Sequence, residues 1–178
     1  WDNWVSGYGT GGTVSGVGRV LREKSPGTKI ILTEPENAAL IGSELKQDRH
    51  SDNTPATSHS SWNPHLIQGW TPDFIPFVLQ EAIDNNYFDK LLPVSGEQGI
   101  TWAKRLARAE GIITGISGGS TFAIAMEVAK DVPPDSNILC MLPDTGERYL
   151  SSPLFEEIPE EMTDDEKKIS LSTPNYQL

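Results

Sequence analysis

The sequence has few of the features that mark secreted, disulfide-stabilised or membrane proteins. Among its 178 residues there is one cysteine, Cys140, so no internal disulfide can form. No apolar run approaches the roughly 20 residues that cross a bilayer, so we expect no membrane span. The first residues have neither the basic start nor the apolar stretch of a signal peptide. We therefore expect an intracellular, reducing compartment, with cytoplasm, plastid and mitochondrion all left open.

Basic residues are also scarce. Lys and Arg number 14 against 25 Asp and Glu, which gives a formal net charge of -11. A surface this acidic repels a phosphate backbone, so nucleic acid is not expected as a partner. Seven of the acidic residues fall close together near the end of the chain: Glu156, Glu157, Glu160, Glu161, Asp164, Asp165 and Glu166. We predict that residues 156–178 form an acidic, solvated tail, whose short helix opens at the capping box Thr163-Asp-Asp-Glu166.

Side chains that bind metals or act as nucleophiles are not grouped in the sequence. The three histidines, His50, His59 and His65, lack metal-ligand spacing, so no metal site is expected. Cys140 lies in the apolar run 138–142, which predicts a buried structural thiol rather than a reactive one.

Apolar runs alternate with helical patterns along most of the chain. Strands are predicted at residues 4–6, 29–33, 91–94 and 137–142, and Glu34-Pro35 ends the second of them. Helices are predicted over residues 14–23, after Thr71 as cap and Pro72, after the capping box of Ser95 and Gln98, and after the Gly/Ser turn 115–119. This alternation predicts an α/β fold for residues 1–155, in which helices cover both faces of a parallel, twisted sheet.

One long segment, residues 47–64, is polar and shows no periodicity. It is too long for a simple connection between two elements. The sequence leaves open whether it is a functional loop or a mobile one.

The segment Gly7-Tyr-Gly-Thr-Gly-Gly-Thr13, here called the glycine loop, lies between a predicted strand and a predicted helix. Free amide groups and the positive helix end make such a loop an anion site, and glycines let the backbone approach a phosphate closely. Gly7, Gly9 and Gly12 also satisfy the dinucleotide pattern G-x-G-x-x-G, with Glu34 where a ribose-binding acid would stand. The glycine loop alone therefore predicts a phosphate site without naming its ligand.

Four motifs follow one another along nearly the whole chain. They are VSGYGTGGTVSGVG at residues 5–18, HLIQGWTPDFIP at 65–76, GISGGS at 115–120 and LPDTGERYLS at 142–151. In this order they resemble the phosphate loop, the active-site cleft, the second Gly/Ser turn and the ring-binding strand end of the cysteine synthase family, also called O-acetylserine sulfhydrylase. The dinucleotide alternative accounts for the first motif alone.

The resemblance implies the C-terminal portion of a fold-type II enzyme with pyridoxal 5'-phosphate as cofactor. It assigns the cofactor phosphate to Gly9, Thr10, Gly11, Gly12 and Thr13, the pyridine nitrogen to Thr145, and the substrate cleft to Gly69. A neutral hydroxyl at the pyridine nitrogen holds no proton there, so the ring is a weaker electron sink. That suits the family's reaction, in which O-acetylserine and sulfide give L-cysteine and acetate.

The resemblance also implies that parts of the enzyme lie outside this chain. The family's Schiff-base lysine and its substrate-carboxylate loop precede the phosphate loop, so we expect the lysine upstream of Trp1 and no catalytic residue here. The implied partners are this missing N-terminal portion and a second subunit in a homodimer, with serine acetyltransferase or a larger complex left open as a further partner. A non-catalytic subunit, or another fold-type II enzyme such as cystathionine β-synthase or threonine dehydratase, remains an alternative, followed by a dinucleotide-dependent dehydrogenase.

Overall fold

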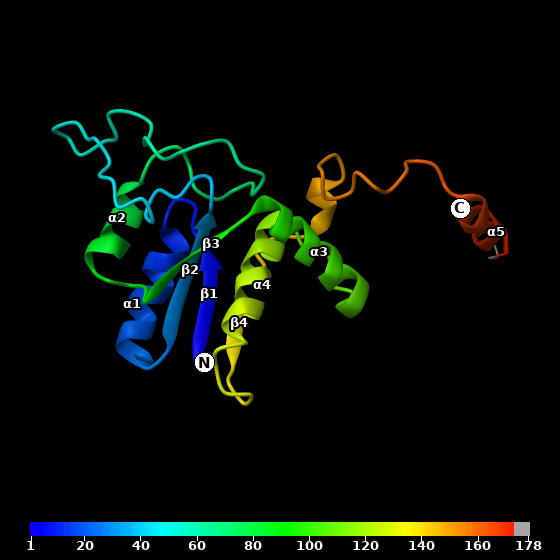
Figure 1. The fold of residues 1–178 in the computed structure, drawn as a ribbon, viewed down its shortest axis with the longest axis horizontal. Coiled ribbons are helices and arrows are strands. Elements are labelled where there is room, and N and C mark those ends of the chain that lie inside the picture. Colours follow the sequence, from blue (N-terminus) through cyan, green and yellow to red (C-terminus); the bar gives the residue numbers. More distant parts are fainter. Residues whose placement is uncertain (173–178) are drawn as a thin grey trace, which may run out of the picture.

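Four parallel strands form the centre of the protein. The computed structural model describes residues 1–172. Its sheet has the order β3-β2-β1-β4, with all strands pointing the same way (Figure 1). The strands are β1 (Asn3–Gly7), β2 (Lys29–Pro35), β3 (Lys90–Val94) and β4 (Ile138–Cys140). The predicted parallel α/β fold is confirmed, although β2 runs through Glu34-Pro35 and β4 is shorter than residues 137–142.

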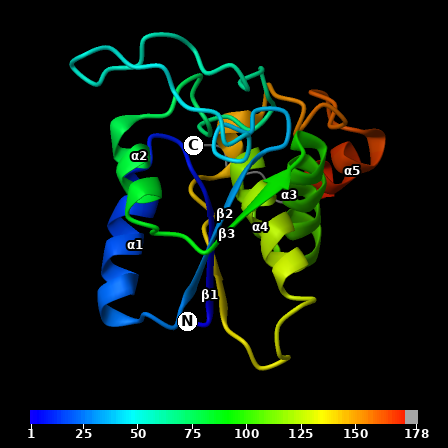
Figure 2. The same cartoon turned by 60° about the vertical axis from the view of Figure 1, so that its left-hand side comes forward.

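Helices cover both faces of the sheet. The long helices are α1 (Gly12–Lys24), α2 (Phe77–Asp84), α3 (Gly96–Glu110) and α4 (Ile116–Val128). The pair α1 and α2 lies on one face, and the pair α3 and α4 lies on the other (Figure 2). A short 3-10 helix, η1 (Gly146–Tyr149), follows β4. The resulting three layers are those predicted from the sequence.

Alternating side chains of the central strands supply the two cores. Successive residues of a strand point to opposite faces. Trp4, Ile30 and Leu32 therefore belong to the core under α1 and α2, whereas Val5 and Ile31 belong to the core under α3 and α4. All five are at most 2 % exposed, so the middle of the sheet is sealed on both sides.

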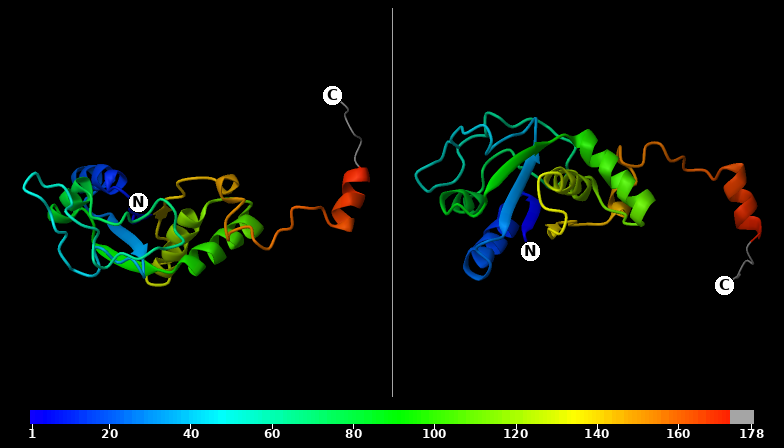
Figure 3. Two further views of the ribbon diagram at one scale, coloured as in Figure 1. Left: turned by 90° about the horizontal axis from the view of Figure 1, so that it is seen from above. Right: turned by 60° about the horizontal axis from the view of Figure 1, so that its bottom comes forward.

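Both predicted capping boxes are present. The Ser95 hydroxyl accepts from the Gln98 amide at 3.1 Å, and the Gln98 side chain accepts from the Ser95 amide at 2.9 Å. Thr163 and Glu166 exchange the same pair of bonds at the start of α5 (Asp164–Ser172). Helix α5 stands apart from the body at the end of an extended segment (Figure 3), and residues 156–172 are all exposed. The division of the chain at residue 155 stays a prediction.

The prediction of a helix that begins at Thr71 and Pro72 is wrong. Helix α2 begins at Phe77, with Pro76 as its N-cap. Thr71 has a φ of 41° and donates its amide to the Tyr8 carbonyl at 2.9 Å. The Asp73 carbonyl accepts from the His59 amide at 2.6 Å. These tertiary hydrogen bonds hold the segment outside a helix and override its local capping signal.

The Gly/Ser turn predicted at residues 115–119 is also corrected. Only Gly115 precedes the helix, since α4 begins at Ile116 and includes Ser117, Gly118 and Gly119 in its first turn. A Cβ at Gly119 would overlap the Gly99 carbonyl and lie 2.7 Å from the Ala103 amide nitrogen. These glycines therefore do not form a loop. They belong to α4 and allow it to pack closely against α3.

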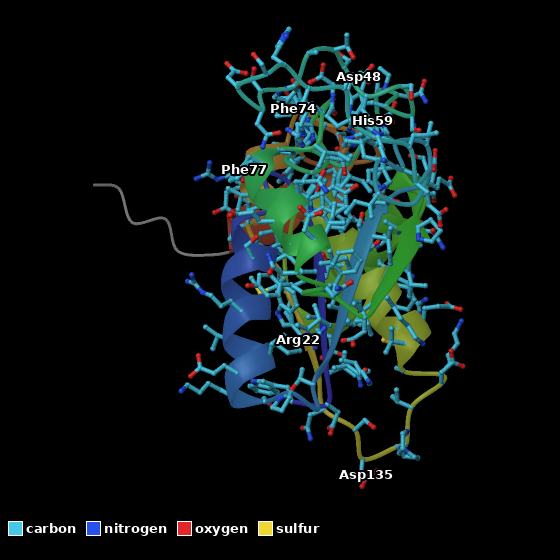
Figure 4. The ribbon with its side chains drawn as sticks, turned by 90° about the vertical axis from the view of Figure 1, so that its left-hand side faces the viewer. Arg22, Asp48, His59, Phe74, Phe77 and Asp135 are labelled. Atoms are coloured by element: carbon cyan, nitrogen blue, oxygen red, sulfur yellow. The ribbon has the colours of Figure 1, made fainter. Side chains whose placement is uncertain are left out.

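The long polar segment 47–64 is tied to the rest of the chain at several points. The buried Gln47 side chain accepts from the Ile75 amide at 2.9 Å and donates to the Thr57 carbonyl at 2.7 Å. The segment lies over the carboxyl end of the sheet. Figure 4 shows its residues Asp48 and His59 at this end of the molecule and Asp135 at the opposite end. Within residues 1–172, no helix has the length and apolar character needed to cross a bilayer.

Candidate cofactor site

The glycine loop turns directly into α1. Strand β1 ends at Gly7, α1 begins at Gly12, and Gly11 is its N-cap with a φ of 93°. In the described part of the chain, the amides of residues 9–13 donate to no other backbone group. No acidic side chain occupies the first turn of α1. Free amides at a positive helix end are an anion-binding arrangement.

A hollow of about 460 Å³ opens over the glycine loop. It is lined by residues 7–14 and Gly69, none of which is charged. The loop packs tightly on its other side, because a Cβ at Gly11 would lie 2.5 Å from the Leu79 backbone. A Cβ at Gly9 would lie 2.6 Å from the Gly69 carbonyl oxygen. The structure thus brings Gly69 against the predicted phosphate-binding residues.

A second hollow of about 270 Å³ adjoins the first. The two share Gly7, Gly9, Thr13 and Gly69 in their linings. The second continues past the ends of β1 and β4, where it is lined by Gln68, Trp70, Ser117, Thr121, Met141, Pro143, Asp144 and Tyr149. Parallel strands bring their carboxyl ends to one edge, where α/β sheets bind ligands.

Trp70 forms a wall of the second hollow. Its ring lies where a Cβ at Gly7 would be, and it is 9 % exposed. The preceding Gly69 has a φ of 83°, and a Cβ there would meet nothing within 4 Å. The absence of a side chain at both glycines therefore leaves room for the indole and for the hollow.

Thr145 lies beside the second hollow rather than in its lining. Thr145 is exposed, and its backbone forms an isolated antiparallel β-bridge with that of Thr114. The lining at this end includes the hydroxyls of Ser117, Thr121 and Tyr149. The Thr121 hydroxyl donates to the Ser117 carbonyl at 3.0 Å and the Tyr149 hydroxyl donates to Asp144, whereas Ser117 is 3 % exposed in the first turn of α4. The role of Thr145 stays a prediction, and the geometry favours Ser117 as a hydroxyl donor to a ligand here.

Asp144 and Tyr149 form a hydrogen-bonded pair at the same end. The Tyr149 hydroxyl donates to Asp144 Oδ2 at 2.5 Å. Burial, together with the bond to this carboxylate, raises the pKa of Tyr149 to about 12, so the phenol stays protonated at neutral pH. Asp144 Oδ1 lies 2.5 Å from the position of a Cβ at Gly115, the N-cap of α4. The pair therefore requires glycine at residue 115.

Glu34 does not serve the role that the dinucleotide alternative gives it. Its side chain is 2 % exposed. The carboxylate accepts from the Tyr8 hydroxyl, from the Gly42 amide at 2.8 Å and from the Ile41 amide at 3.2 Å. A carboxylate that is buried and bonded in this way is not available to a ribose, so the dinucleotide interpretation is wrong.

Comparison with known proteins identifies the family. Residues 1–144 match the family described as pyridoxal-phosphate dependent enzyme. The chain belongs to this family. It is 39 % identical to O-ureido-L-serine synthase of Streptomyces lavendulae over 97 % of the chain and 47 % of the relative. It is 34 % identical to a cysteine synthase of Staphylococcus aureus over 86 % of the chain and 43 % of the relative.

Solved structures agree with the sequence comparison. A crystal structure of a lysine-to-alanine mutant of O-ureido-L-serine synthase has a TM-score of 0.77 at 38 % identity, over 98 % of this chain and 48 % of the other. Cysteine synthase of Entamoeba histolytica has a TM-score of 0.70 at 31 % identity, over 98 % and 46 %. The predicted resemblance to fold-type II enzymes is confirmed, and the chain spans about half the length of these relatives.

The family's cofactor, pyridoxal phosphate, fits the two hollows. Its phosphate carries about -1.5 to -2 charges at neutral pH. The amides of residues 9–13 and the exposed residues Thr10 and Thr13 offer hydrogen-bond donors on one side of the first hollow. The adjoining hollow, whose lining includes Trp70 and Ser117, offers room for the ring. The assignment of the phosphate to the glycine loop remains a prediction.

Other titratable groups lie outside this family site. Burial raises the pKa of the Cys140 thiol to about 12, so a reactive thiolate is not present at neutral pH. His59 is buried, with Nδ1 accepting from the Ser61 amide at 3.2 Å and Nε2 facing the Leu45 carbonyl at 3.1 Å. Among residues 1–172, no three His, Cys, Asp or Glu side chains gather in a metal-binding group.

Proposed function

We propose that this chain is the cofactor-holding part of an enzyme that replaces the β-substituent of an activated serine. The proposed reaction converts O-acetylserine and sulfide to L-cysteine and acetate. The observation that carries this proposal is the row of unbonded amides at the start of α1. These amides face the first hollow, which shares lining residues with the second hollow at the ends of β1 and β4. An O-acetylserine sulfhydrylase of Entamoeba histolytica shares the fold over nearly the whole chain.

A second candidate reaction is the synthesis of O-ureido-L-serine. Its supporting observation is that the synthase of Streptomyces lavendulae is more similar to this chain, at 39 % identity, than the cysteine synthase of Staphylococcus aureus, at 34 %. Both reactions would place a nucleophile on the β-carbon of a serine derivative, so the same hollows would serve either. Cystathionine β-synthase and threonine dehydratase chemistry remain further alternatives within the fold.

The proposal gives each part of the site a task. Pyridoxal phosphate, when bound, supplies the electron sink for breaking bonds at the substrate's α-carbon. Residues 9–13 would bind its phosphate, and Trp70 would form one wall beside its ring. The hydroxyl of Ser117, or of Thr145, would meet the pyridine nitrogen without giving it a proton. Because Ser117 lies in the first turn of α4, the positive helix end also disfavours an added proton there.

The remaining machinery is proposed to lie in another part of the protein. No lysine of this chain is in a motif that resembles the family's Schiff-base lysine. We propose that the lysine and the loop for the substrate carboxylate belong to an N-terminal portion, and that the complete enzyme is an intracellular homodimer. A non-catalytic subunit of a larger complex is the alternative. Serine acetyltransferase would be a partner only if the cysteine synthase reaction is correct.

Titration of the 178-residue chain tests the proposed site. We expect pyridoxal phosphate to bind and to quench the fluorescence of Trp70, and inorganic phosphate to compete with it. We also expect no absorbance from a lysine adduct and no cysteine synthase turnover. Thr10→Val and Thr13→Val should weaken binding by about tenfold each, since each removes a hydroxyl donor to a charged group. Normal binding by both variants would exclude these hydroxyls from the site.

Three hydroxyl variants of the complete enzyme decide between Ser117 and Thr145. Ser117→Ala is expected to lower kcat by about tenfold, because a hydrogen bond to the ring is lost. Thr145→Ser should be nearly silent, and Thr145→Ala should have little effect because the Thr145 side chain lies outside the lining. A loss in Thr145→Ala with an unchanged Ser117→Ala would return the role to Thr145. Steady-state rates with O-acetylserine and sulfide provide the measurement.

A further inference from the structure

A buried carboxylate lies beneath the glycine loop, at the carboxyl end of β2. Glu34 takes part in no ion pair within the described residues. It is satisfied instead by three donors: the Tyr8 hydroxyl and the amides of Ile41 and Gly42. Burial raises the pKa of the Glu34 carboxyl. A charge held in the interior without a cation is costly, and hydrogen bonds must compensate for the lost water.

Tyr8 connects this carboxylate to the glycine loop. It stands between Gly7 and Gly9, and its side chain is 2 % exposed within the core under α1 and α2. Burial beside Glu34 raises the pKa of the Tyr8 hydroxyl, so it stays a hydrogen-bond donor. The Tyr8 carbonyl also accepts from the Thr71 amide at 2.9 Å. Tyr8 is therefore fixed through both its side chain and its main chain.

The glycine loop has no other anchor of this kind. Four of its seven residues are glycines, which hold no backbone conformation by themselves. Thr10 and Thr13 are exposed. Tyr8 thus contributes the one buried side chain of residues 7–13. An anion site made of amides binds tightly only when the amides are already held in place, because ordering them on binding opposes affinity.

We propose that Tyr8 and Glu34 are positioning residues for the cofactor phosphate. Their buried hydrogen bond holds the amides of residues 9–13 in the arrangement that receives the phosphate, although neither side chain touches the ligand. Glu34 also accepts from the Ile41 and Gly42 amides, so the same carboxylate restrains the segment that follows β2. The proposal rests on the proposed function of the glycine loop.

Two variants separate positioning from a purely structural role. Tyr8→Phe keeps the ring in the core and removes the hydroxyl, whereas Glu34→Gln keeps the shape and removes the charge. Tyr87→Phe is the matched control, because Tyr87 packs against Gly18 on α1 and lines neither hollow. Each purified chain is titrated with pyridoxal phosphate, with inorganic phosphate and with pyridoxal, which has the ring but lacks the phosphate. The midpoint of urea unfolding is measured for each.

The positioning role predicts a loss confined to the phosphate ligands. In Tyr8→Phe the Kd values for pyridoxal phosphate and inorganic phosphate should rise about tenfold, with that for pyridoxal unchanged. Glu34→Gln should show the same selective loss, and it decides alone if Tyr8→Phe does not fold. Unchanged phosphate affinity in a folded variant, or an equal loss for pyridoxal, would overturn the proposal. If the unsubstituted chain binds no phosphate at all, the proposed function itself fails.

Discussion

Replacing Gly11 with alanine is expected to remove phosphate binding and to lower the free energy of unfolding by about 3 kcal/mol. Gly11 is the N-cap of α1 and has a φ of 93°. A residue with a Cβ adopts this left-handed conformation at a cost of about 1–2 kcal/mol. A Cβ would also lie 2.5 Å from the backbone of Leu79, which cannot move as a side-chain tip can. The loop would have to shift away from α2, and its amides would turn with it.

Gly111→Ala is the matched control for this experiment. Gly111 has a φ of 68°, and a Cβ there would meet nothing within 4 Å. Its substitution should therefore report only the cost of the backbone conformation, about 1–2 kcal/mol, at the end of α3. Urea unfolding and pyridoxal phosphate titration of both variants provide the comparison. Equal destabilisation with intact phosphate binding in Gly11→Ala would contradict the geometry of the glycine loop.

Replacing Gly119 with alanine is expected to lower the free energy of unfolding by about 3 kcal/mol. A Cβ at this position would overlap the Gly99 carbonyl and press on the Ala103 amide, so α3 and α4 would be forced apart. This displacement would also move Ser117, two residues earlier on α4, and weaken cofactor binding. The measurement is again urea unfolding with pyridoxal phosphate titration.

Gly16→Ala is the control for Gly119→Ala. Gly16 lies inside α1, and a Cβ there meets nothing within 4 Å. Alanine should therefore raise stability by about 0.5–1 kcal/mol through its higher helix propensity. A stabilising or neutral effect of Gly119→Ala would show that the two helices do not need this close approach.

The elements that the sequence predicts well are those with purely local signals. The strand around Ile30 and Ile31 is an uninterrupted apolar run, and the box of Ser95 and Gln98 satisfies its own amides within four residues. Thr71 carries an equally good local signal, but its amide is bonded to Tyr8, far away in the sequence. Only the folded structure reveals that competition.

The site was predictable by motif but not by individual side chain. The glycine loop, Gly69 and the strand end around Asp144 do lie together, because parallel strands place their ends at one edge. Which hydroxyl is proposed to meet the pyridine nitrogen depends on which side chain faces the second hollow. The sequence does not distinguish Thr145 from Ser117 in this respect. Glu34 shows how a sequence position can mislead. Its place after the second predicted strand suggested a contact with a ribose, but in the structure its carboxylate accepts from the Tyr8 hydroxyl.

The pairing of β1 with β4 has a consequence for the order in which the protein is built. Asn3 pairs with Ile138, so β1 can pair with β4 only after more than a hundred further residues have been synthesised. Contacts this distant along the chain slow folding, because a long loop must close before they form. On the ribosome, the glycine loop and its support from β2 can assemble first. The hollow proposed to hold the ring is lined by Asp144 and Tyr149, so it can form only after β4 and η1 have been made. The proposed phosphate site would therefore form before the proposed ring site.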